Sequence, residues 1–128
     1  MFTREKTIQK IFDRHTDAVF ITNTGYISRA VYDLFPDNKN IFYMQGSMGL
    51  APCMHLGITH TIAEQKLKNL FVYVLDNGCH ESVGEFDCVT LENSYPGINQ
   101  IFKISNDGKK DRVGLDTKKN TKQIKELF

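Results

Sequence analysis

Short, almost wholly apolar runs alternate along the chain with segments whose apolar residues recur every three or four positions. Runs of the first kind are typical of strands buried on both faces of a sheet, and segments of the second kind are typical of amphipathic helices. The sequence predicts strands at residues 18–22, 40–45, 69–75 and, more weakly, 100–104. It predicts helices that begin at Thr7, Ser28, Leu50 and Lys118, the third weakened by Pro52 and Gly57.

This alternation predicts an α/β fold, specifically a three-layer α/β/α domain with a mainly parallel sheet. The three strongest strands are expected to be parallel neighbours in that sheet, where ligands bind at the carboxyl ends of the strands. Each of those strands ends in a polar turn that contains glycine, namely Thr24-Gly25, Gly46 to Gly49, and Asp76-Asn77-Gly78. One such turn is an ordinary tight connection, but three at one edge predict a binding site.

Composition excludes several classes of function. The 128 residues suffice for a single domain, 1–128, and 41% hydrophobic with 24% charged residues is ordinary for a soluble protein. A net charge of +1 gives no reason to expect nucleic acid or membrane partners, and no apolar run approaches the roughly 18 residues of a membrane span. Three cysteines without a CxxC pair argue against a disulfide framework or a zinc site, so a cytoplasmic location is expected.

The segment from Lys103 to Glu126 is rich in basic residues, with eight Lys or Arg against four acids. Such a segment is typical either of a surface for phosphate-rich partners or of a solvated face. No aromatic residues alternate with the charges, as a stacking platform for nucleic acid requires. A solvated face is therefore the favoured interpretation.

The turn Gly46-Ser47-Met48-Gly49 follows a predicted strand and precedes a predicted helix. Glycines at this place let the backbone approach a ligand closely, and the start of a helix offers unpaired N–H groups. A plain strand-to-helix turn has the same pattern, so the motif alone favours no ligand.

The stretch from Asp76 to Ser82 contains more side chains that could bind a metal or take part in a reaction. The side-chain oxygen of Asn77 is a hard ligand suited to Mg²⁺ at the end of a strand. The alternative is a simple Asn-Gly turn followed by solvated His80 and Glu81. A Cys79–His80 nucleophile pair is disfavoured, because adjacent side chains on an extended segment point apart and no third group orients them.

Together these stretches resemble the diphosphate-binding domain of the thiamin-diphosphate-dependent phosphonopyruvate and sulfopyruvate decarboxylases. The resemblance covers most of the chain in the family's order, and the NGCHESVG string is closer to the phosphonopyruvate enzymes. It implies the thiamin-diphosphate-binding form of the α/β fold, with Mg²⁺ and thiamin diphosphate as cofactors. The matching segments are TNTGYISRAVYDL (22–34), FYMQGSMGLAPCM (42–54), HLG (55–57), KNLFVYVLDNGCHESVGE (68–85) and the tail (103–128).

The resemblance assigns roles residue by residue. Six residues of the first two turns would bind the cofactor: Thr24, Gly25, Gly46, Ser47, Met48 and Gly49. Among them, Met48 would be the apolar wedge that holds the cofactor bent, and the Gly46 carbonyl would accept a hydrogen bond from the aminopyrimidine. Asn77 would ligate the metal through its side chain and Cys79 through its carbonyl. His80, Glu81 and Ser82 would be candidates on the substrate side.

The chain also departs from the family pattern. Between the GSMG turn and the metal-binding Asn, the family has a further strand that ends in Gly-Asp-Gly-Ser and carries the principal metal ligand. Here Met54 is followed directly by His55, and a second segment is shortened at about 86–102. The domain is therefore expected to be incomplete.

The resemblance implies a decarboxylase that converts phosphonopyruvate to phosphonoacetaldehyde and CO₂, a step of phosphonate metabolism. A sulfopyruvate decarboxylase subunit and a non-catalytic relative that lacks the metal Asp are the alternatives. The glutamate that activates the aminopyrimidine would come from a pyrimidine-binding partner domain or subunit, so no catalytic residue is assigned here and an oligomer is expected. If the resemblance is set aside, a small flavodoxin-like nucleotide-binding module is the remaining interpretation.

Overall fold

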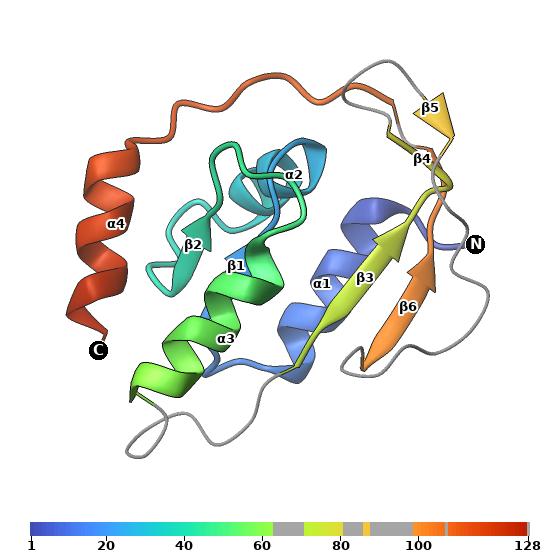
Figure 1. Ribbon diagram of the computed structural model, residues 1–128. Helices are drawn as coiled ribbons and strands as arrows, with labels where there is room; N and C mark the ends of the chain where they lie inside the picture. The colour runs from blue at the N-terminus through green and yellow to red at the C-terminus, as the bar shows by residue number, and fades with distance from the viewer. Residues whose placement is uncertain (63–70, 81–85, 88–98, 107, 128) are drawn as a thin grey trace.

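The structure is a computed structural model that describes residues 1–62, 71–80, 86–87, 99–106 and 108–127 (Figure 1). Within these residues the helices are α1 (Arg4–Arg14), α2 (Tyr26–Leu34), α3 (Ala51–Ile62) and α4 (Thr117–Glu126). The strands are β1 (Phe20–Thr22), β2 (Ile41–Tyr43), β3 (Tyr73–Asp76), β4 (Cys79–His80), β5 (Phe86–Asp87) and β6 (Gln100–Lys103). The predicted alternation of helices and parallel strands is confirmed, and the chain is an α/β protein.

The strands form three two-stranded sheets among the described residues. β1 and β2 are parallel, with Phe20 opposite Ile41, and β3 and β6 are parallel, with Tyr73 opposite Gln100. β4 and β5 form a short antiparallel pair. We refer below to the first two pairs as the β1–β2 ribbon and the β3–β6 ribbon.

The prediction that β3 lies in one sheet with β1 and β2 is wrong. β3 takes its hydrogen-bonded neighbour from β6, and side chains rather than backbone groups connect it to β1. Phe20 of β1 and Leu75 of β3 pack against both buried clusters of the molecule. Apolar character alone does not specify which edge of a strand a neighbour takes, and here β6 pairs with β3 over four residues.

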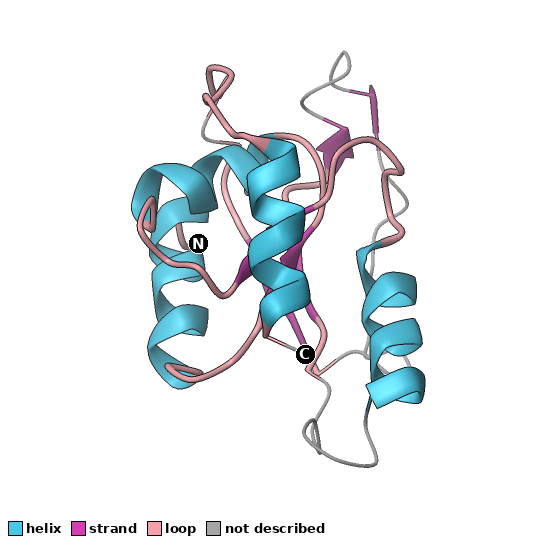
Figure 2. Cartoon of the chain, turned by 90° about the vertical axis from the view of Figure 1, so that its left-hand side faces the viewer, coloured by secondary structure: helices cyan, strands magenta, loops and turns pink. Residues whose placement is uncertain are grey.

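Helices lie on both sides of the strands, which gives the layered arrangement that the sequence predicts (Figure 2). α1 and α2 pack against each other on one side, and α3 contacts β1 from the other. α4 lies beside β2. None of the helices in the described parts of the chain is both long enough and apolar enough to span a membrane.

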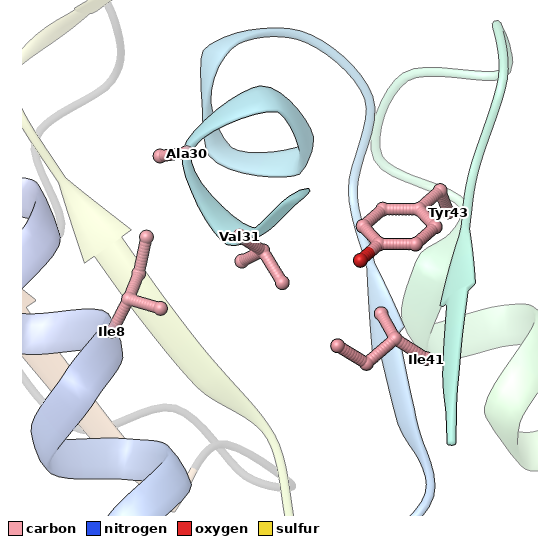
Figure 3. Close-up of a cluster of buried hydrophobic side chains, with 5 residues drawn as sticks. All are labelled: Ile8, Ala30, Val31, Ile41 and Tyr43. Atoms are coloured by element: carbon pink, nitrogen blue, oxygen red, sulfur yellow. The ribbon is translucent and has the colours of Figure 1, made fainter. Parts of the chain in front are cut away.

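The main core lies between α1, α2 and β2. Ile8, Ala30, Val31, Ile41 and Tyr43 point toward one another there (Figure 3). α1 begins at a Thr N-cap whose hydroxyl accepts from the third helical N–H, which satisfies one of the unpaired donors of the first turn. The amphipathic pattern of the helices thus determines which faces are buried.

α1 also connects the two ribbons. Its residue Ile11 joins Phe102 and Ile104 in a second buried cluster. Just after α1, the Nε2 atom of His15 lies 2.7 Å from the Tyr73 hydroxyl. A single helix therefore packs on both ribbons, which are otherwise not hydrogen-bonded to each other through their strands.

One side chain of α4 hydrogen-bonds to the backbone along the edge of β2 that does not pair with β1. Asn120 is buried, with 5% of its surface exposed. Its Oδ1 accepts from the Tyr43 N–H at 3.2 Å, and its Nδ2 donates to the Ile41 carbonyl at 2.6 Å. The amide side chain thereby makes the two hydrogen bonds that a neighbouring strand would make, and buried backbone groups at an edge need such partners.

α3 shows that Pro52 does not weaken the helix as the sequence suggested. Pro52 is the second residue of α3, within the first turn, where the backbone N–H has no helical acceptor and its loss costs nothing. The helix continues through Met54, His55 and Gly57 without interruption.

Candidate functional site

The first two glycine turns lie together at the carboxyl ends of β1 and β2. The N–H of Gly49, in the second turn, donates to the Oδ1 of Asn23, in the first, at 3.0 Å. Gly25 is the N-cap of α2 with φ 88°, a conformation that favours glycine, and no side chain caps this helix start. Gly46, Ser47 and Gly49 also have positive φ values. The backbone of the two turns therefore forms one side of the binding site that the sequence predicts.

A buried hydroxyl pair supports the first turn. The hydroxyl groups of Thr22 and Ser28 lie 2.7 Å apart, and the Ser28 hydroxyl also donates to the Asn23 carbonyl. Thr22 and Ser28 are both buried. These bonds join the end of β1 to the first turn of α2 and thereby orient Asn23, whose side chain reaches the second turn.

The two turns border a cavity of about 440 Å³. Of the six predicted cofactor-binding residues, Thr24, Gly25 and Met48 line it, and Gly46, Ser47 and Gly49 belong to the same turn as Met48. Met48 is half exposed. The volume of the cavity falls within the range of roughly 300–1,000 Å³ that small-molecule sites occupy.

Tyr43 of β2 also lines the cavity. Burial, with a smaller effect from Tyr32, raises the pKa of Tyr43 to about 12. The phenol therefore stays protonated at neutral pH.

Sequence reasoning missed two arginines in the cavity wall, Arg29 of α2 and Arg112. Arg112 belongs to residues 108–116, a segment that we call the strap, which crosses one end of the molecule to reach α4 (Figure 1). The alternation of Val113 and Leu115 in an otherwise polar stretch is the signal that this segment packs against the domain. Both of these apolar residues line the cavity.

Cationic side chains of α1 and α2 hold the strap. Arg4 donates to the Gly108 carbonyl at 3.3 Å, and Arg29 donates to the Lys110 carbonyl at 2.5 Å. The Lys110 ammonium lies 3.0 Å from Glu5. Burial alone would raise the pKa of Glu5, but its hydrogen bond with Lys110 and the charge of Arg4 outweigh that effect and lower the pKa. Glu5 thus remains charged and keeps Lys110 in place.

The polar groups at the end of β3 bind one another instead of lining the cavity. Asn77 Nδ2 donates to Asn106 Oδ1 at 2.8 Å, and the Cys79 Sγ lies 3.2 Å from Asn106 Nδ2. Asp76 forms an ion pair with Lys103, its partner across the ladder. That bond, with a further one from the Gly78 N–H, lowers the pKa of Asp76 although partial burial opposes the shift.

The remaining predicted residues follow Cys79. His80 lies in β4, and Glu81 and Ser82 fall outside the described residues. The structure therefore brings the predicted cofactor-binding residues together and leaves the predicted metal ligands, Asn77 and Cys79, outside the set that lines the cavity.

The described residues fit thiamin diphosphate better than they fit its metal ion. The cavity combines an apolar side chain, Met48, with backbone turns and cationic groups, which suits a flat heterocycle joined to a diphosphate. No group of three or more His, Cys, Asp or Glu residues gathers within the described parts of the chain. Mg²⁺ favours carboxylate oxygens in near-octahedral geometry, and Asn77 with the Cys79 carbonyl supplies no charged oxygen.

The comparison with known proteins agrees with the geometry. No family model matches the chain. The chain is 30% identical over 107 residues to the sulfopyruvate decarboxylase subunit beta of Methanothermobacter thermautotrophicus. The chain is similar to a decarboxylase subunit. The match covers 66% of this chain and 57% of the relative, so the chain spans less than two thirds of the relative's length.

The two coverages also show that the alignment bridges a deficit in this chain. Because 66% of 128 residues is about 84, roughly 23 of the 107 aligned positions have no residue here. A deficit of this size is about that of one strand with its connection, since parallel strands need about a dozen or more connecting residues.

Proposed function

We propose that this chain is the diphosphate-binding part of a thiamin-diphosphate-dependent decarboxylase that acts on a small 2-oxo acid. The observation that carries the proposal is the convergence of Thr24, Gly25 and Met48 on one cavity at the carboxyl ends of β1 and β2. The similarity to a decarboxylase subunit supports it independently. When bound, the thiamin group supplies the stabilised carbanion that decarboxylation of a 2-oxo acid requires.

The chain's own residues would bind and orient this group. The turn at Thr24-Gly25, at the uncapped start of α2, offers backbone N–H donors of the kind that hold a diphosphate. Met48 offers an apolar surface for the bent heterocycles. The general base chemistry would come from a pyrimidine-binding subunit, since none of the described residues that line the cavity has a carboxylate.

Two substrates remain candidates, and a different observation favours each. The NGCHESVG string favours phosphonopyruvate, whereas the curated relative is named as a subunit that acts on sulfopyruvate. Both acids carry a tetrahedral anionic group, and both would lose CO₂. The deficit of roughly 23 aligned positions is similar in size to the shortening expected near Met54–His55, and a non-catalytic relative that lacks the metal Asp is the third candidate.

Binding of thiamin diphosphate to Met48→Ala tests the site. Met48 and Leu50 are both 50% exposed, but only Met48 lines the cavity, so Leu50→Ala is a matched control. Loss of part of a methionine's apolar burial predicts about tenfold weaker thiamin diphosphate binding by calorimetry in Met48→Ala, with Leu50→Ala unchanged. Equal affinities of the two variants would contradict the proposal.

A second experiment addresses the reaction. The chain, mixed with a pyrimidine-binding subunit, should release CO₂ from phosphonopyruvate or sulfopyruvate, and the ratio of the two kcat/KM values identifies the substrate. Thiamin diphosphate binding without CO₂ release from either acid would support the non-catalytic relative.

A further inference from the structure

The cavity has two cationic side chains to which the family resemblance assigns no role. Two of its lining residues, Arg29 and Arg112, are cationic, and none of them is acidic. Guanidinium groups bind phosphate oxygens with paired, charge-assisted hydrogen bonds. A cavity whose described lining has two such groups and no carboxylate favours an anion.

The two arginines stand in different situations. Arg29 uses one N–H on the Lys110 carbonyl and lies over the Tyr26 ring, with its guanidinium carbon 5.3 Å from the ring centroid. It thus has a fixed position, and a guanidinium has five N–H donors in all. Arg112 is exposed and has no partner among the described residues, so its donors are available to a ligand.

The strap positions Arg112 at the cavity mouth. The hydrogen bonds to the Gly108 and Lys110 carbonyls, together with the Lys110–Glu5 ion pair, fix the segment just before Arg112. Leu115 packs against the main core just after it. Because the backbone on both sides of Arg112 is held, binding of an anion orders the side chain but costs little further backbone freedom.

We infer that this cavity binds a diphosphate group through Arg29 and Arg112 without a divalent cation. The described residues do not gather a metal site, and the two guanidinium groups can neutralise the charge that Mg²⁺ would otherwise neutralise. The inference rests on the proposed function only for the identity of the natural ligand, thiamin diphosphate. The anion site itself follows from the arginines.

Calorimetry with inorganic diphosphate in the presence of EDTA tests this inference. The unmodified protein should bind in EDTA within about twofold of its affinity in Mg²⁺. Arg112→Ala should bind at least about tenfold more weakly, because a charge-assisted contact is lost, and Arg112→Lys should lie between them. Lys109→Ala removes the same charge from an exposed strap residue outside the cavity, and should stay within about twofold.

Two results would overturn the inference. One is binding that occurs only when Mg²⁺ is present. The other is an equal loss in Arg112→Ala and Lys109→Ala, which would assign the effect to general charge. Thermal unfolding of each variant, monitored by circular dichroism, checks that the fold is kept.

Competition experiments separate this inference from the proposed function. If Arg112 is needed for diphosphate but thiamin diphosphate does not compete, the anion site stands and the proposed function fails. If thiamin diphosphate binds only with Mg²⁺ and is indifferent to Arg112→Ala, the inference fails and the proposed function stands. Phosphonoacetate serves as a probe for the anionic group of the substrate. If only the binding of phosphonoacetate is weakened in Arg112→Ala, the cavity binds the anionic group of the substrate, which overturns the diphosphate assignment.

Discussion

The β1–β2 ribbon and the β3–β6 ribbon end in similar glycine turns but use them differently. At the end of β1 and β2, Asn23 joins the two turns and a cavity remains between them. At the end of β3, Asn77 is hydrogen-bonded to Asn106, and Asp76 is paired with Lys103. A polar turn at the carboxyl end of a parallel strand is therefore not sufficient to form a binding site. Whether it binds a ligand depends on which of its groups the rest of the chain already uses.

The ribbons also differ in where an asparagine side chain binds their backbone. In the β1–β2 ribbon, Asn120 of α4 binds two backbone groups of β2 in the protein interior. In the β3–β6 ribbon, an asparagine binds the backbone between the two strands: the side chain of Asn99, just before β6, accepts from the N–H of Val72, just before β3, at 2.6 Å on the exposed surface. Water can replace the second contact but not the first.

Substitution of these two asparagines should give the largest effect. Asn120→Ala leaves a buried N–H and a buried C=O without partners, so the free energy of unfolding should fall by about 2–4 kcal/mol. Asn99→Ala should lower it by less than about 1 kcal/mol, because water satisfies the exposed donor. Urea unfolding of both variants measures the difference. Similar losses would show that the backbone groups bound by the two asparagines are equally shielded from water.

A smaller effect should come from the Asp76–Lys103 pair. The pKa of Asp76 is lowered in the folded protein below its ordinary value of 3.8, so its contribution is present at neutral pH and is lost as the pH falls below about 4. Asp76→Asn should destabilise the protein at pH 7 by no more than about 1 kcal/mol, since Lys103 is half exposed. The difference from the unmodified protein should shrink as the pH falls through the lowered pKa of Asp76.

Lys103→Gln is the complementary variant, because it removes the same pair from the other strand. Denaturant unfolding at a series of pH values measures both variants. A difference that stays constant from pH 7 to pH 2.5 would show that the carboxylate charge is not responsible.

The smallest effect is expected at Asn77. Because Asn77 does not line the cavity, Asn77→Ala should bind inorganic diphosphate within about twofold of the unmodified protein, with or without Mg²⁺. His80→Ala is the control in the neighbouring strand. The family resemblance implies the opposite, a selective loss of Mg²⁺-dependent binding in Asn77→Ala. That result would make the β3–β6 ribbon part of the site.

The local features of the fold could be predicted from the sequence. The apolar runs located β1, β2, β3 and β6, and the periodic segments located α1, α2, α3 and α4 to within a few residues at most of their described ends. Apolar patterning and turn residues determine such features over short stretches of chain. The glycine turns were also placed correctly at strand ends.

The pairing of the ribbons could not be predicted in the same way. Each of the three strongest strands is apolar, and apolar character does not specify which of two edges another strand takes. The arginines of the cavity were missed for a related reason. Arg4 and Gly108 are 104 positions apart, and Arg29 and Lys110 are 81 positions apart, so no local pattern signals that the strap folds back.

The contact between Asn120 and β2 has a consequence for synthesis of the chain. The amide that seals the edge of β2 lies 77 and 79 residues after the two groups it binds. At about 5–20 residues per second, translation of that interval takes roughly 4–16 s. During this time the nascent β2 has an open edge, which is the kind of surface that pairs with other chains.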